Sequence, residues 1–190
     1  MKKCSTAWVI LGFALVVGSG CSPASMATRA IKEIKGASSE IREIPGTVTG
    51  GFDRFNGATI SPLRNELGGL VSEQFTSSLP VMLHKYLIEE KKAPFHGDSP
   101  RLTIEPQMQW FRETSGIGKL FGSDSYAVVL FKLSADGTEL GKLEVATKEA
   151  AARSGRKAMA KSMAKKLAHW FQERRDAAEK KKNDEEEDED

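Results

Sequence analysis

The residue types of a phosphate-binding loop occur together in the middle of the chain. They are Gly116, Gly118, Lys119 and Gly122. A P-loop places four residues between its glycines and follows its lysine with Ser or Thr. Here Leu120 follows Lys119, and the segment precedes an expected strand instead of a helix. We therefore interpret the segment as a glycine-rich hairpin loop and predict no nucleotide cofactor.

The same loop carries large apolar side chains that a simple connector does not need. These residues are Ile117, Leu120 and Phe121. Exposed apolar side chains on a loop often mark contacts with other molecules. We predict that these three residues contact a partner or the membrane surface, and the alternative is a plain connecting loop.

Metal-binding and acid–base chemistry have no matching pattern in the sequence. The histidines His84, His96 and His169 fall in three separate expected elements, without the HExxH spacing of a zinc site. No G-x-S-x-G sequence marks a serine nucleophile. We therefore predict no metal, no cofactor and no enzymatic activity.

A row of lysines is the best candidate for binding an anionic surface. Lys157, Lys161 and Lys165 follow one another at four-residue steps, so they share one face of an expected helix. Wall polymers, lipid headgroups or an acidic protein would suit this face chemically. The alternative is a solvated helix face without a partner.

The first twenty-one residues have the pattern of a lipoprotein export signal. Two lysines precede an apolar segment, 7–17, which is shorter than the roughly 20 residues that cross a bilayer. Small residues then lead to Cys21 as in a bacterial lipobox, with Gly18 where lipoboxes usually carry Leu. We predict a signal peptide over residues 1–20 and a lipid, including palmitate, on Cys21.

Acylation of Cys21 would determine where and how the mature chain is held. Ser22 follows the cysteine, as in lipoproteins delivered to the outer membrane, so we predict a domain in the periplasm, with surface exposure left open. Cys4 leaves with the signal, so no cysteine remains for a disulfide or for thiolate chemistry. Export also argues against nucleic acid as a partner.

The charges are unevenly distributed along the chain. There are 28 Lys and Arg residues and 26 Asp and Glu residues, and seven of the acids form the run Asp184–Asp190. Without this run and the signal, 26 basic and 19 acidic residues leave a net charge of +7. Like charges in a block repel one another, so we predict a disordered tail over 177–190. We expect a tether over 21–45 and a single domain over 46–176.

Two amphipathic helices are expected. Apolar residues recur every three or four positions over 62–92, and a serine and a proline at its start suit a helix cap and first turn. Two adjacent glycines and Pro80 leave open two helices that meet near Ser77. The second helix is expected over 154–176, with its apolar face opposite the lysine row.

Strands are expected between these helices. Their ranges are 101–111, 126–133 and 139–147, and another strand is expected over 47–55. In the first range Leu102, Ile104, Met108 and Trp110 alternate with polar residues, which places all four on one buried face. Pro106 predicts an edge strand or a bulge, and Asp136-Gly137 predicts a hairpin turn. The fold class is therefore α+β, with a small antiparallel sheet of three or four strands and two helices packed on one face.

This order of elements resembles a family of small envelope lipoprotein domains. The family is related to the curli-secretion lipoprotein and to penicillin-binding-protein activators. The matching pieces are Leu79–Glu90, Leu102–Trp110, Ser125–Leu133, Asp136-Gly137 and Ala158–Phe171. The resemblance covers about half of the mature chain and implies a binding or assembly module, while the paired glycines near residue 68 and the acidic tail depart from it.

The sequence thus predicts a membrane-anchored lipoprotein that acts as a non-enzymatic binding or assembly module in the cell envelope. Its expected partners are the membrane, through the lipid on Cys21, and envelope proteins or anionic wall polymers. The alternative is an envelope hydrolase that acts on cell-wall polymers.

Overall fold

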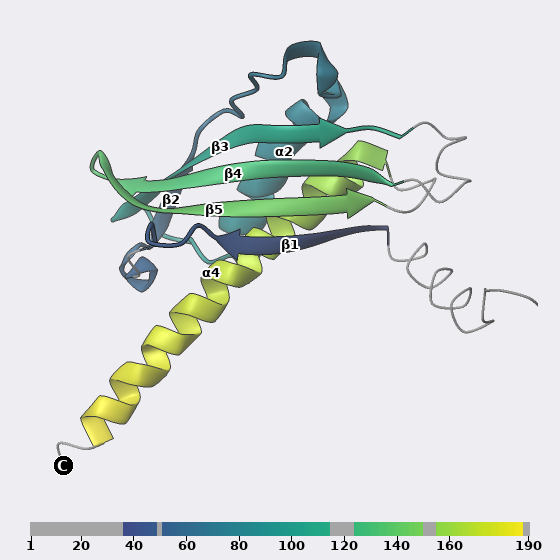
Figure 1. Ribbon diagram of the computed structural model, residues 1–190. Coiled ribbons are helices and arrows are strands. Elements are labelled where there is room, and N and C mark those ends of the chain that lie inside the picture. Colours follow the sequence, from purple (N-terminus) through teal and green to yellow (C-terminus); the bar gives the residue numbers. More distant parts are fainter. Residues whose placement is uncertain (1–35, 49–50, 115–123, 150–154, 188–190) are drawn as a thin grey trace, which may run out of the picture.

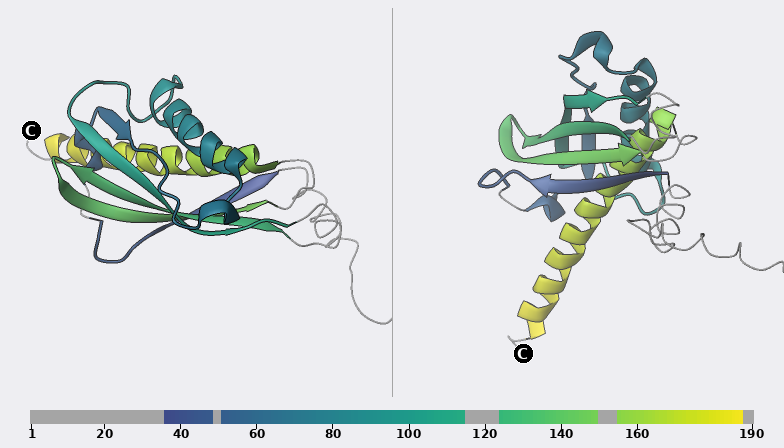
Figure 2. Two further views of the ribbon diagram at one scale, coloured as in Figure 1. Left: turned by 90° about the horizontal axis from the view of Figure 1, so that it is seen from above. Right: turned by 45° about the vertical axis from the view of Figure 1, so that its right-hand side comes forward.

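The computed structural model describes residues 36–48, 51–114, 124–149 and 155–187. In this part of the chain, two helices cover one face of a five-stranded sheet (Figures 1 and 2). The helices are α2 (Glu73–His84) and α4 (Gly155–Glu187). The predicted α+β fold class, with two main helices packed on one face of a sheet, is confirmed.

Three long antiparallel strands form the centre of the sheet. They are β3 (Arg101–Arg112), β4 (Ser125–Ala135) and β5 (Thr138–Glu149). Every second side chain of β4 is buried, as its alternation requires. Asp136 and Gly137 connect β4 to β5 with φ angles of 51° and 78°, the left-handed values of a two-residue hairpin turn. The three predicted central strands and the hairpin are therefore confirmed.

Two further strands make the sheet larger than expected and mixed in direction. The strand β1 (Ala37–Glu43) pairs antiparallel with β5, and β2 (Gly57–Ile60) pairs parallel with β3. The strand order is β1-β5-β4-β3-β2. The prediction of a three- or four-stranded antiparallel sheet is therefore wrong in strand number and in the direction of β2.

The segment before the sheet's centre also differs from its prediction. Phe52–Arg54 form a short 3-10 helix (η1) inside the expected strand 47–55, and its Phe52 is buried. Ala37–Glu43 lie within the expected tether, 21–45, but belong to the sheet. Polar residues dominate this strand, so its pairing with β5 and not its own propensity determines its structure.

The helix α2 begins eleven residues later than the predicted start at Pro62. Before it, Arg64 pairs with β3: its N–H donates to Pro106 O at 2.9 Å, and its own carbonyl oxygen accepts from Met108 N–H at 2.8 Å. Gly68 then adopts a φ of 58°, which ends any continuous helix. Pro80 lies inside α2, so the alternative of two helices meeting near Ser77 is also wrong. A π-helical turn (η3, Lys85–Glu89) follows α2.

The helix α4 continues beyond the sheet and through most of the predicted disordered tail. It ends at Glu187 instead of near residue 176 (Figure 1). Arg175 Nη1 donates to the carbonyl oxygens of Phe55 and Pro94, at 2.7 Å each, and Lys182 Nζ lies 3.4 Å from Asp53 Oδ2. These contacts hold the turns after the sheet as far as Lys182, and the acidic residues 184–187 continue the helix beyond them.

One core fills the space between the sheet and the helices. Phe171 is its aromatic centre: its ring centroid lies 5.0 Å from that of Phe95, 4.9 Å from that of Trp170 and 5.9 Å from that of Phe52. All four rings are buried. Within the described ranges, no helix has the length and apolar character needed to cross a membrane.

Candidate functional site: the uncovered face of the sheet

A β-bulge determines which side chains of β3 reach the uncovered face of the sheet. Met108 pairs with Val129 and Trp110 pairs with Val128, so Gln109 is one extra residue opposite the regular ladder of β4. Met108 and Phe111 are consequently both buried, and Trp110 points away from the helices with 46% of its surface exposed. The expectation that Trp110 shares the buried face with Met108 is therefore wrong.

Trp110 forms part of an aromatic pair with a cation beside it. The ring centroids of Trp110 and Tyr126 are 6.2 Å apart and the planes are tilted by 46°. Lys148 Nζ lies 5.6 Å from the centroid of the Tyr126 ring and 2.6 Å from Asp124 Oδ2. The hydrogen bond to Asp124 is the main cause that raises the pKa of Lys148 above its ordinary value, so this ammonium stays charged beside the rings.

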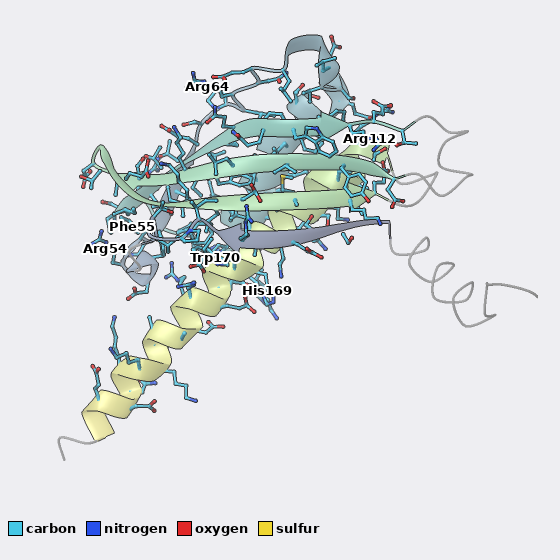
Figure 3. All side chains as sticks on the ribbon, viewed as in Figure 1. Arg54, Phe55, Arg64, Arg112, His169 and Trp170 are labelled. Atoms are coloured by element: carbon cyan, nitrogen blue, oxygen red, sulfur yellow. The ribbon has the colours of Figure 1, made fainter. Side chains whose placement is uncertain are left out.

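The rest of the uncovered face offers apolar and charged side chains. Val128 and Leu130 are half-buried in the row beside Trp110, and Ala146 is exposed on β5. Arg112 is exposed at the end of β3 and has no ion pair with any residue in the described ranges (Figure 3). Exposed aromatic, apolar and cationic groups of these types are common on surfaces that contact other macromolecules.

A shallow hollow of about 260 Å³ lies farther along the same face. It is lined by Ser61, Pro62, Arg64, Glu105, Pro106, Gln107 and Lys132. Arg64 belongs to the margin beyond β3 and forms an ion pair with Glu66 at 2.7 Å (Figure 3). We call the surface that extends from Trp110 and Tyr126 to this hollow the open face.

A second hollow, of about 310 Å³, lies where α4 passes the loop after η3. His96 and Asp176 are both in its lining, without a hydrogen bond between them, and Arg175 in the same lining already donates to two backbone carbonyls. The hollow therefore lacks an oriented His–carboxylate pair of the kind that general acid–base catalysis uses.

The predicted lysine row is exposed on α4. Lys157, Lys161 and Lys165 are exposed while Met159 and Met163 on the opposite side of the helix are buried. Whether this row binds an anion stays a prediction. The other predicted site residues, Cys21, Ile117, Leu120 and Phe121, lie outside the described residues.

The histidines are dispersed, as their positions in the sequence indicate. His84 Nδ1 lies 3.1 Å from Glu89 Oε1, and His169 Nε2 lies 3.3 Å from Glu173 Oε1, all on the surface. In the part of the chain that the structure covers, no three His, Cys, Asp or Glu residues are grouped so that they could hold a metal ion.

Sequence reasoning missed Trp110 and Tyr126 as site residues. A regular two-residue period predicts Trp110 to be buried, and only the apolar pair Trp110-Phe111 signals that the period shifts. A strand that must bury both Met108 and Phe111 needs an extra residue between them, which is the signal that could have revealed the bulge.

Comparison with known proteins does not assign the chain to a family. No protein-family model and no curated protein matches it. Among solved structures, it is similar to a PelC dodecamer from Paraburkholderia phytofirmans, with a TM-score of 0.46 and 14% identity over 68% of this chain and 94% of that one. A second PelC dodecamer from that organism, in another crystal form, gives a TM-score of 0.43 and 13% identity over 69% and 93% of the two chains.

Proposed function

We propose that the protein is an outer-membrane lipoprotein, anchored through Cys21, whose domain is a non-enzymatic module that binds an envelope protein in the periplasm. The open face is the binding surface in this proposal. The observation that carries it is the bulge at Gln109, which places the ring of Trp110 on the side of the sheet that no described helix covers.

The composition around Trp110 supports a protein partner. Trp, Tyr and Arg are the residue types that contribute most binding energy at protein interfaces, and they do so at the centre of a patch that excludes water. Trp110, Tyr126 and Arg112 provide all three types within a few residues of one another on paired strands. Val128 and Leu130 extend the apolar area next to them.

The alternative of a hydrolase acting on wall polymers has less support. Two close carboxylates or an oriented His–carboxylate pair would favour it. The hollow beside α4 that His96 and Asp176 line shows no hydrogen bond between them.

Photo-crosslinking in intact envelopes tests the proposal. A photoreactive residue in place of Gln109 should form a distinct adduct with a protein, and the same residue in place of Val81, which is 60% exposed on α2, should not. Adding Trp110→Ala should weaken the interaction about 30-fold, as expected for a hot-spot residue, and remove the adduct. Equal adducts from both positions, or an adduct unaffected by Trp110→Ala, would contradict the open face as the binding surface.

A further inference from the structure

The charges on α4 are segregated along its length. From Gly155 to Gln172 the helix contains no acidic residue, whereas Asp184–Glu187 are all acidic. The cations of the first half are Arg156, Lys157, Lys161, Lys165 and Lys166. The helix is therefore positive at its start and negative at its end, and it would orient in the field of a negatively charged surface.

The lysine row of the first half is not neutralised by the described part of the chain. Lys157 and Lys161 have no ion pair there, and the ammonium of Lys165 lies 5.3 Å from the centroid of the Tyr86 ring. Lys85 Nζ lies 5.7 Å from the same ring centroid, so it adds a cation beside the row. We call Lys157, Lys161, Lys165 and Lys85 the basic strip.

The basic strip is close to the point where the N-terminal segment joins the fold. Ala37, at the start of β1, pairs with Glu149, only six residues before α4 begins. Two residues later, the Ser39 hydroxyl donates to Ser162 Oγ at 2.9 Å, in the turn between Lys161 and Lys165. Cys21 is fifteen residues before Gly36, so the chain between them spans at most about 50 Å.

We infer that the basic strip docks on anionic phospholipid headgroups of the bilayer that holds the lipid of Cys21. This inference rests on the anchoring part of the proposed function. A short attachment keeps the strip at a high effective concentration near the headgroups, and each cation near an anionic surface strengthens the association about fivefold. The strip lies on the helix layer, so docking leaves the open face on the opposite side of the sheet turned away from the bilayer (Figure 2).

Lysine reactivity in vesicles tests the inference directly. The full lipidated protein is reconstituted in vesicles of phosphatidylcholine with or without phosphatidylglycerol, treated with a water-soluble acetylating reagent and analysed by mass spectrometry. We expect acetylation of Lys157, Lys161 and Lys165 to fall several-fold on the anionic vesicles and to recover at high salt. Lys180 and Lys181, exposed near the other end of α4, should react equally on both. Equal acetylation of the row on both kinds of vesicle overturns the inference.

Brominated phosphatidylglycerol determines which face meets the bilayer. After signal removal the chain has two tryptophans, Trp110 on the open face and the buried Trp170, so quenching reports mainly on Trp110. Trp110 should remain unquenched, and its quenching would show that the open face, not the basic strip, contacts lipid. The same acetylation experiment is repeated with cell-wall fragments added. If the lysine row is protected from acetylation only when the fragments are present, and equally on neutral vesicles, the strip binds a wall polymer and the inference is overturned.

A charge-matched pair of variants completes the test. K157Q/K161Q/K165Q should abolish the difference in acetylation between the two kinds of vesicle at the remaining lysines beside the row, Lys85 and Lys166. K180Q/K181Q/K182Q removes the same charge from the same helix and should preserve that difference. Intact mass reports separately whether Cys21 carries lipid. A chain without lipid therefore refutes the anchoring proposal, while a lipidated chain with an unprotected row refutes only the docking of the strip.

Discussion

Met108 and Trp110 are separated by one residue, yet their side chains lie on opposite faces of the sheet. Two residues of a regular strand separated in this way share a face, so the extra residue Gln109 produces the difference. The bulge buries Phe111 against Phe75, with ring centroids 5.6 Å apart, and it leaves Trp110 exposed. The insertion of Gln109 therefore allows Phe111 to pack in the core and also exposes Trp110 on the candidate binding surface.

Deleting Gln109 should leave both faces of β3 intact. Without the extra residue, Met108, Trp110 and Phe111 become consecutive and alternate regularly, with Trp110 still opposite Val128. We expect the variant to unfold cooperatively with a Tm close to that of the native protein, measured by circular dichroism.

Deletion of Gln107 is the matched control for this prediction. It shifts the preceding residues of β3 by one position, which moves Leu102 and Ile104 from the buried face to the open face. We expect this variant to lose its cooperative transition. If the two deletions were equally damaging, the bulge at Gln109 would not have the role assigned to it.

Phe171→Ala should be among the most destabilising single substitutions. The ring is fully buried and packs edge-on against Phe95 and Trp170. Removing it leaves a cavity, and we expect a loss of about 3–5 kcal/mol in the free energy of unfolding, measured by urea denaturation. Trp110→Ala, which removes an exposed ring, should cost much less, and a comparable loss would argue that Trp110 is part of the core.

Arg175→Leu tests how α4 is held after it passes the sheet. The variant keeps an apolar stem but removes both hydrogen bonds, leaving the carbonyl oxygens of Phe55 and Pro94 without this donor. We expect a loss of about 1–3 kcal/mol in the free energy of unfolding. Lys180→Leu makes the same change of charge at an exposed position of the same helix and should have little effect.

The ion pair of Lys148 with Asp124 should be visible in a pH titration. Because the folded pKa of Lys148 is raised, its contribution to stability is fully present below the unfolded value of 10.5 and is lost as the pH rises through the folded pKa. Asp124→Asn should lower the pKa of Lys148 toward 10.5, measured from the side-chain NMR shifts of the lysine. An unchanged pKa in the variant would show that Asp124 is not the cause.

Removal of the acidic end should not affect folding. A chain that stops at Asn183 keeps the Lys182–Asp53 contact and loses the exposed pair of Lys181 and Glu185, whose charged atoms are 3.6 Å apart. Exposed pairs of this kind contribute little, so we expect the free energy of unfolding to change by less than about 0.5 kcal/mol. A larger loss in thermal denaturation would show that the acidic residues pack against the domain.

The central strands and the second helix were predictable because their signals are local. Apolar side chains alternate between buried and half-buried positions along β4. The Asp136-Gly137 turn requires positive φ angles, and Met159 and Met163 repeat at a helical spacing. The edge strand β1 was not predictable, since Ser38, Ser39 and Glu40 have no strand preference of their own and gain structure from pairing with β5.

The start of α2 and the site were missed for a related reason. Leucines before Gly68 repeat at a helical spacing, but Arg64 uses its backbone groups to pair with β3, which only the folded sheet can offer. Likewise, the face on which Trp110 lies depends on the bulge at Gln109, which forms only when β3 pairs with β4. The lysine row was identified because its four-residue period does not depend on any other element.

The edge position of β1 has a mechanical consequence for an anchored protein. If Cys21 is held in the bilayer as proposed, tension between the membrane and a bound partner enters the domain at Ala37 and acts along β1. Seven residue pairs with β5 then share the stress in shear. The Ser39–Ser162 hydrogen bond and the Glu43–Arg174 ion pair transfer part of it to α4. Pulling would therefore have to break these contacts together and not one after another. The edge strand β1 thus gives the domain mechanical resistance at the point where the anchor is attached.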